Sequence, residues 1–370
     1  MNVRGAVLRE MGLPAPYAES RPLAIEQLEL DGPGPGELLV RVGAAGLCHS
    51  DLSVIDGSRP RVMPMVLGHE AAGEVVEVGP QTAGFAAGDH VVLAFVPSCG
   101  SCGPCLSGRA ALCEPGAAAN TAGSLLSGDR RWHDGLHHHL GVSAFADHIV
   151  VSARSAVRVD PELPHEIAAL FGCAVLTGVG AALNSAQVGP MDSVAVFGLG
   201  GVGLAALLGA VVSGAATIVA VDLVPEKLEL ALELGATHAV AAGDETVAAI
   251  RAITGGGANK VIETVGNAGV LADAYAATRR GGTTVTVGLP HPERMLSIPA
   301  VSLVAEERTL KGSYLGSCVP ARDIPRFIDL YQRGRLPVDR LLTDTLALDE
   351  LNEGFDRLAR GEGVRQAVVF

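Results

Sequence analysis

The spacing of apolar and polar residues changes along this chain. Residues 1–45 alternate short apolar and polar runs around a stretch rich in glycine and proline at 32–36, which predicts antiparallel strands joined by tight turns. In contrast, residues 167–191 and 194–221 contain no charged side chain. Uninterrupted apolarity of this kind is typical of a parallel sheet that is buried on both faces. The pattern therefore predicts a mainly β N-terminal region followed by an α/β region.

The two uncharged runs are also long enough to suggest membrane spans. However, both contain repeated glycine, Pro190 interrupts the first, and the flanking residues Glu166, Asp192 and Asp222 are acidic rather than basic. We therefore interpret the runs as parts of a buried sheet and expect no membrane association.

Residues 193–222 have the pattern of a strand, a glycine turn, a helix and a second strand. The turn matches G-x-G-x-x-G, the fingerprint of dinucleotide-binding folds. Its first glycine permits the tight turn, its second lets a pyrophosphate approach the backbone, and its third lets the helix pack closely on the strand. The helix N-terminus would then face the phosphates. The candidate cofactor-binding residues of this turn are Gly198, Gly200, Gly201, Val202 and Gly203.

The second strand of this unit ends at Asp222, nineteen residues beyond Gly203. A carboxylate at this distance would accept hydrogen bonds from both hydroxyl groups of the adenosine ribose and would repel a 2′-phosphate. No arginine follows Asp222 to bind such a phosphate. The sequence therefore favours NAD(H) over NADP(H).

Further strands and helices follow from the same reasoning. A proline at its first turn and a glycine after its end mark a helix at 225–234. Residues 114–139 lack an apolar pattern and predict a solvated loop that ends in three histidines. The other predicted elements are strands at 146–151, 260–264, 283–287 and 309–314 and helices at 166–183, 324–331 and 351–358. This alternation predicts a doubly wound parallel sheet.

Composition narrows the function classes. The 370 residues are enough for two domains, and 18% charged with 48% apolar residues fits a folded, soluble enzyme. A net charge of −13 would repel phosphate backbones, which disfavours nucleic acid as a partner. The N-terminus lacks the apolar core of a signal peptide, so we expect a cytoplasmic protein. An odd number of cysteines, seven, in close groups then indicates metal binding rather than disulfides.

Four cysteines lie close together at Cys99, Cys102, Cys105 and Cys113, with glycine, serine and proline between the first three. Four thiolates on an irregular loop can surround one Zn²⁺ and leave no position for substrate. We therefore predict a structural zinc site, with redox disulfides or an iron–sulfur cluster as minority alternatives.

Cys48, His69 and Cys173 form a second candidate set. Each of the first two stands near a carboxylate, Asp51 or Glu70, that could support a metal ligand. Taken singly, either could instead be a buried thiol or a hydrogen-bonded histidine. Together with Cys173 they would form a Cys₂His site with an open fourth position, which is the catalytic kind.

These motifs, in this order along the chain, resemble the zinc-dependent alcohol dehydrogenases of the medium-chain dehydrogenase/reductase superfamily. The resemblance runs almost end to end and rests on residues 46–51, 67–70, 99–113, 171–178, 198–203, 285–290, 352–355 and 364–370. It implies an α/β protein in which a Rossmann domain, residues 177–314, is inserted in a GroES-like, mainly β catalytic domain made of residues 1–176 and 315–370.

The resemblance also assigns roles to individual residues. It implies that Cys48, His69 and Cys173 hold a catalytic zinc, that Asp51 orients His69, and that Glu70 lies behind the metal. Ser50 would hydrogen-bond the substrate oxygen. The cofactor contacts that it implies are His49 and Arg365 on the pyrophosphate, Lys227 on the adenosine ribose, and Thr177, Val202 and Val287 on the nicotinamide. The substrate-lining positions that it implies are Phe95, His139, Leu140, Leu289 and Tyr314.

The sequence departs from well-known members of the family at three positions. Ser53 stands where many carry a histidine that ends a proton relay, so solvent or His49 would have to end it. Ala117 stands where glutathione-dependent members carry an arginine, which disfavours that substrate. His139 replaces a residue that is often aromatic, so we expect an elongated apolar or aryl alcohol with one polar contact.

We therefore expect an alcohol dehydrogenase with NAD(H) and two zinc ions per chain, one catalytic and one structural. The sequence leaves two alternatives open: a carbonyl reductase that works mainly in the other direction, and a non-catalytic NAD-binding zinc protein. We also expect a homodimer, because the apolar segment 295–303 resembles the subunit-joining region of the family.

Overall fold

All residues, 1–370, are described by the computed structural model, and the chain divides into two units. The first consists of residues 1–173, 319–326 and 342–370, and the second of residues 174–318 and 327–341. These segments differ from the predicted domains chiefly at residues 327–341, which were expected in the catalytic domain and group with the second unit.

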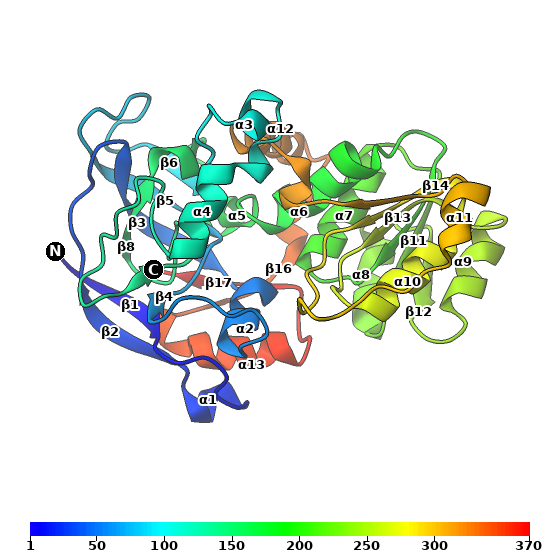
Figure 1. The fold of residues 1–370 in the computed structure, drawn as a ribbon, viewed down its shortest axis with the longest axis horizontal. Helices are drawn as coiled ribbons and strands as arrows, with labels where there is room; N and C mark the ends of the chain where they lie inside the picture. Colours follow the sequence, from blue (N-terminus) through cyan, green and yellow to red (C-terminus); the bar gives the residue numbers. More distant parts are fainter. The chain divides into compact units, whose positions relative to one another are not determined.

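The first unit is built on two sheets (Figure 1). One has the strand order β2-β1-β4-β7, and the other has the order β16-β17-β3-β5-β6-β9 with β8 also paired to β3. The strands are β1 (Asn2–Leu8), β2 (Leu23–Glu29), β3 (Glu37–Gly46), β4 (Met65–Val66), β5 (Ala71–Val78), β6 (His90–Leu93), β7 (His137–His138), β8 (His148–Ser152), β9 (Ala156–Arg158), β16 (Leu342–Leu346) and β17 (Arg365–Val369). The pairs β1–β2 and β3–β5 are antiparallel, which confirms the prediction for the N-terminal region.

Short helices connect these strands. They are α1 (Tyr17–Ser20), α2 (His49–Ile55), α3 (Gly103–Leu106), α4 (Glu114–Ala122), α5 (His165–Leu170) and α13 (Leu351–Ala359), with single helical turns η1 (Ala110–Leu112), η2 (Ala153–Ser155) and η6 (Leu348–Glu350). Helix α12 (Pro320–Gln332) contributes residues to both units.

The second unit is a six-stranded parallel sheet in the order β12-β11-β10-β13-β14-β15. Numbered along the chain, this order is the 3-2-1-4-5-6 of the Rossmann fold. The predicted fold class is therefore confirmed. The strands are β10 (Ser193–Phe197), β11 (Thr217–Asp222), β12 (His238–Ala241), β13 (Ala258–Glu263), β14 (Thr278–Thr286) and β15 (Thr309–Gly312).

Helices cover this sheet, and its strands are apolar because both faces are buried. Ile250 of α9 and Ala274 of α10 pack in one apolar cluster with Phe197 of β10 and Val221 of β11. Alternate strand residues such as Val196 point to the opposite face and are also buried. The helices of this unit are α6 (Ala174–Gly180), α7 (Gly201–Val212), α8 (Pro225–Glu233), α9 (Thr246–Thr254), α10 (Ala268–Ala277) and α11 (Ala300–Ala305), with the π-helical turn η3 (Ala181–Ala186) and the turns η4 (Leu315–Ser317) and η5 (Val338–Leu341). None of the helices is long and apolar enough to span a bilayer.

Two sequence-based predictions were wrong. The predicted loop 114–139 contains helix α4 and strand β7, and its histidines His138 and His139 are buried rather than solvated. The single helix predicted at 166–183 is two helices, because the chain turns between Leu170 and Ala174. Cys173 lies in that turn.

Candidate functional site

Three residues from distant parts of the first unit converge in its interior. Cys48 lies between β3 and α2, His69 lies just before β5, and Cys173 follows α5. Their ligand atoms all lie within 4.8 Å of one another, and Cys173 Sγ is 3.4 Å from His69 Nε2. All three side chains are buried. Two sulfurs and one imidazole nitrogen at this spacing fit a Zn²⁺ ion.

The contacts of these side chains also fit a metal site. A hydrogen bond from Cys173 holds the pKa of the Cys48 thiol well below its usual range, against the effect of burial. The Nδ1 atom of His69 is 3.0 Å from Oδ1 of Asp51, whose side chain is fully buried. An Nδ1–H that donates to this carboxylate leaves the lone pair of Nε2 turned toward the two cysteines. Asp51 therefore orients His69 in the way that the resemblance implied.

Two further rings pack edge-on against His69. The ring centroid of Phe95 lies 5.3 Å away and that of His139 lies 5.5 Å away, both nearly perpendicular to the His69 ring. His139 Nδ1 is also 3.2 Å from Oδ1 of Asp51. Burial lowers the pKa of His139, although Asp51 opposes this, so the imidazole is neutral near pH 7.

The remaining predicted substrate-lining residues divide between the units. Leu140 is buried next to His139 in the first unit. Leu289 and Tyr314 belong to the second unit, where their side chains are 47% and 36% exposed. Their contact with substrate stays a prediction, as does the role of Ser50, which is half-buried in the first turn of α2.

Glu70 and Arg365 form a buried ion pair in the first unit. Glu70 Oε2 lies 3.2 Å from Arg365 Nη2, and Arg365 Nη1 donates to the carbonyl of Leu47 at 2.7 Å. Burial raises the pKa of Glu70 to about 7, although the charge of Arg365 opposes the shift. Glu70 is not part of the converging Cys–His–Cys set. The pyrophosphate contacts of Arg365 and of the exposed His49 stay predictions.

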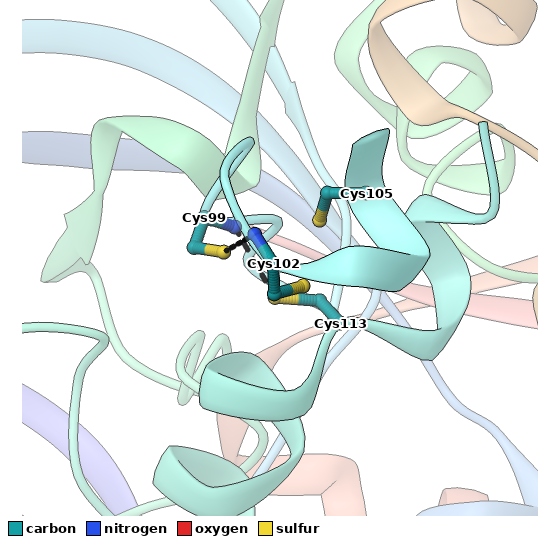
Figure 2. Close-up of side chains that lie close together, drawn as sticks. All are labelled: Cys99, Cys102, Cys105 and Cys113. Atoms are coloured by element: carbon teal, nitrogen blue, oxygen red, sulfur yellow. Dashed lines mark hydrogen bonds between the residues drawn. The ribbon is translucent and has the colours of Figure 1, made fainter. Parts of the chain in front are cut away.

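The second predicted metal site is a lobe formed by Cys99, Cys102, Cys105 and Cys113. Their four sulfurs lie within 4.8 Å of one another, and Figure 2 shows the side chains turned inward from the loop and from α3. The Sγ atoms of Cys102 and Cys113 are 4.0 Å apart, which is about twice the length of a disulfide bond. All four cysteines are free thiols.

Backbone N–H groups donate to sulfurs of this lobe. Cys113 Sγ accepts from the N–H of Cys99 at 3.2 Å and of Gly116 at 3.4 Å, and Cys99 Sγ accepts from the N–H of Cys102 at 3.3 Å. Such donors stabilise thiolates, and those of Ser101 and Cys102 lower the pKa of Cys99 to about 6. Burial has the opposite effect on Cys105 and raises the pKa of its thiol to about 12. The convergence of four cysteine sulfurs is the observation that fits a tetrahedral zinc ion.

The glycine turn of the second unit has the geometry that a dinucleotide needs. Gly198 has a φ of +85°, and a Cβ on Gly203 would lie 1.8 Å from the carbonyl oxygen of Gly198. Both positions therefore require glycine. A Cβ built on Gly200 would have no other atom within 4 Å, so a phosphate can approach the backbone of Gly200.

Asp222 has a second contact that the sequence did not predict. Its Oδ2 accepts from the N–H of Leu199 in the glycine turn at 2.6 Å, and its Oδ1 accepts from the N–H of Val224 at 3.0 Å. The carboxylate therefore holds the turn in place as well as standing at the end of β11. The other predicted cofactor residues Thr177, Val202, Lys227 and Val287 are half-buried, and their contacts stay predictions.

Two residues at the carboxyl end of β13 were not singled out from the sequence. The hydroxyl of Thr264 donates to the carbonyls of Phe197 and Gly198, both at 3.0 Å, and so supports the glycine turn. Glu263 is buried beside it. A polar pair directly after the apolar residues Val261 and Ile262 of a parallel strand is the signal that could have found them, since ligands bind at that edge.

Comparison with known proteins finds relatives over the whole chain. Residues 34–161 match the alcohol dehydrogenase GroES-like domain, and residues 201–333 match the zinc-binding dehydrogenase family. The chain is 40% identical over its full length to an NDMA-dependent alcohol dehydrogenase of Amycolatopsis methanolica, 99% of which is covered. It is 39% identical, again over its full length, to a geraniol dehydrogenase of Castellaniella defragrans, 98% of which is covered. Among solved structures, a benzyl alcohol dehydrogenase of Acinetobacter calcoaceticus superposes with a TM-score of 0.93 at 34% identity, with 100% of this chain and 99% of that chain covered.

Proposed function

This chain belongs to the zinc-dependent alcohol dehydrogenases of the medium-chain dehydrogenase/reductase superfamily, and we propose that it oxidises an apolar or aryl alcohol, primary or secondary, with NAD as the hydride acceptor. The observation that carries the proposal is the buried convergence of Cys48, His69 and Cys173, which leaves one position open on a metal ion. The names of two relatives, geraniol dehydrogenase and benzyl alcohol dehydrogenase, support an apolar or aryl substrate.

The residues of the chain have separable tasks in this reaction. Cys48, His69 and Cys173 would hold a zinc ion, which would supply a Lewis acid that lowers the pKa of a bound alcohol. Asp51 fixes the ring of His69, and Phe95 and His139 pack against that ring and exclude water from it. Ser50 would hydrogen-bond the substrate oxygen and relay its proton by giving up its own hydroxyl proton to solvent or to His49. The hydroxyl of Ser53 donates to the carbonyl of His49 at 2.8 Å and does not act as a base near neutral pH.

The decisive experiment combines metal analysis with an absorbance assay. We expect two zinc ions per chain and NADH formation from aryl and long-chain alcohols. One zinc ion and no turnover would instead support a non-catalytic NAD-binding protein. Because one relative is named an NDMA-dependent alcohol dehydrogenase, the assay includes NDMA as an alternative acceptor. Turnover with NDMA but not with added NAD would show that added NAD is not the electron acceptor and would contradict this part of the proposal. A panel of aldehydes tests the alternative of a carbonyl reductase.

Cofactor preference depends on Asp222 in this proposal. Replacing Asp222 with glycine should lower the preference for NAD over NADP by about tenfold or more, since the carboxylate that repels a 2′-phosphate is removed. Affinity for both cofactors should also fall, because the N–H of Leu199 loses its acceptor. Asp222→Asn, which keeps an acceptor oxygen, is the matched control and should preserve more of the affinity for NAD. The measurement is kcat/KM with each cofactor, and an unaltered ratio in Asp222→Gly would contradict the assignment.

We also propose that two copies of the chain associate through the segment around α11. Met295, Val301 and Val304 are 84%, 73% and 82% exposed, an unusual exposure for apolar side chains on one short segment. A homodimer should therefore be seen by light scattering, and Val304→Glu should shift it toward the monomer. A wild-type monomer would contradict the proposal.

A further inference from the structure

Glu263 is a buried acidic side chain in the second unit that no motif of the sequence assigned to a function. It is the last residue of β13, and its side chain is 1% exposed. In the sheet it lies beside Phe197, the last residue of β10, after which the glycine turn begins. In folds of this strand order, ligands bind outside the carboxyl ends of the strands, where the order reverses, and here that point is between β10 and β13. The carboxylate therefore lies at the edge of the sheet that faces the cofactor.

Two neutral donors hold the carboxylate. Oε1 accepts from the backbone N–H of Gly266 at 2.7 Å, and Oε2 accepts from the hydroxyl of Thr286 at 2.6 Å. Both oxygens thus act as acceptors, as they do in an ionised carboxyl group. Neither donor carries a charge that would cancel the negative charge of Glu263. Burying a carboxylate costs folding free energy. When its hydrogen-bond donors are neutral, its negative charge can interact electrostatically with a ligand that binds nearby.

The same contacts connect Glu263 to the proposed nicotinamide wall. Thr286 ends β14 and is followed by Val287, the residue expected to contact the nicotinamide. The N–H of Val287 donates to the carbonyl oxygen of Glu263 at 2.9 Å. The backbone and the side chain of Glu263 therefore both fix the segment that carries Val287.

We propose that Glu263 strengthens the binding of the oxidised, positively charged nicotinamide relative to that of the reduced, neutral one. The inference rests on the proposed function, because it takes the ligand to be a nicotinamide dinucleotide. A fixed negative charge at this edge attracts the cationic ring and does not attract the neutral ring. Binding that favours the oxidised cofactor in this way assists alcohol oxidation rather than carbonyl reduction, and the sequence alone does not set that direction.

The test is a comparison of dissociation constants on the full-length protein by isothermal titration calorimetry. In Glu263→Gln, which keeps the shape and removes the charge, the Kd of NAD⁺ should rise by about three- to tenfold while the Kd of NADH changes much less. Thr286→Val is the matched control, because it removes one hydrogen bond and keeps the charge. It should change the two constants by the same factor. Circular dichroism and thermal unfolding confirm that each variant is folded.

Each outcome decides the proposal. An equal loss of affinity for NAD⁺ and for NADH in Glu263→Gln would show that Glu263 has a purely structural role and would overturn the inference. If Glu263→Gln does not fold, Glu263→Asp decides: it keeps the charge, so a wild-type ratio of the two constants supports the inference and a ratio shifted toward NADH overturns it. If the wild-type protein binds neither NAD⁺ nor NADH, it is the proposed function that fails, and a normal affinity for both with an unshifted ratio in Glu263→Gln overturns this inference alone.

Discussion

Replacing Cys173 with alanine should lower kcat/KM for alcohol oxidation by more than about 100-fold while NADH binding stays measurable. Cys173 Sγ lies 3.4 Å from His69 Nε2 and belongs to the buried set with Cys48, so its loss leaves two protein ligands for the metal. A catalytic zinc site normally has three. The glycine turn and Asp222 belong to the second unit and are unchanged by this substitution. Activity is measured by NADH absorbance, and zinc content by metal analysis should fall by one ion per chain.

Cys318→Ala is the matched control for this experiment. Cys318 is also a fully buried cysteine that forms no disulfide, but it belongs to neither cysteine set. Its Sγ accepts from the side-chain amide of Asn184 at 3.2 Å, so alanine there costs stability without removing a metal ligand. Full activity in Cys173→Ala, or an equal loss of activity in both variants, would refute the assigned catalytic site.

The nucleotide-binding half of the fold could be predicted from the sequence because its signals are local. Strand, glycine turn, helix and acidic residue all fall within 193–222, and β10, α7 and β11 lie where that pattern placed them. Glycine positions are informative for the same reason: a Cβ at Gly203 would overlap the carbonyl of Gly198, so the sequence must keep glycine there.

The parts that the sequence missed depend on contacts between distant residues. Helix α4 has no apolar stripe and begins at the sulfur of Cys113, which accepts from the N–H of Gly116. Its side chains are mostly small, and pattern analysis cannot detect a helix without an apolar stripe. The break between α5 and α6 was also missed, because residues 171–176 continue an apolar run across the turn.

The candidate site shows the same division. The identity of its metal ligands followed from cysteine and histidine spacing and from resemblance to a family. The contact between His139 and Asp51 did not, since the two residues are 88 positions apart and lie in segments with no shared motif. Burial of the histidine tract is a property of the folded first unit, where β7 pairs with β4, and composition alone suggested the opposite.

Replacing Cys113 with alanine should destabilise the first unit and release the structural zinc while the catalytic zinc stays bound. Cys113 is fully buried, and its sulfur lies close to those of the other three cysteines. The same sulfur accepts hydrogen bonds from two backbone N–H groups. Structural zinc sites contribute about 10–16 kcal/mol across their ligands, so the loss of one ligand should cost about 3 kcal/mol or more. For a unit of this size the melting temperature should fall by roughly 6–12 °C.

Differential scanning calorimetry and metal analysis on the same samples measure both effects. Leu106→Ala is the matched control, because Leu106 lies in the same lobe with a side chain that is 74% exposed and should leave the melting temperature and the zinc content unchanged. A wild-type melting temperature together with an undiminished zinc content in Cys113→Ala would show that the four sulfurs do not share a metal, and the lobe would then be held by its backbone hydrogen bonds alone.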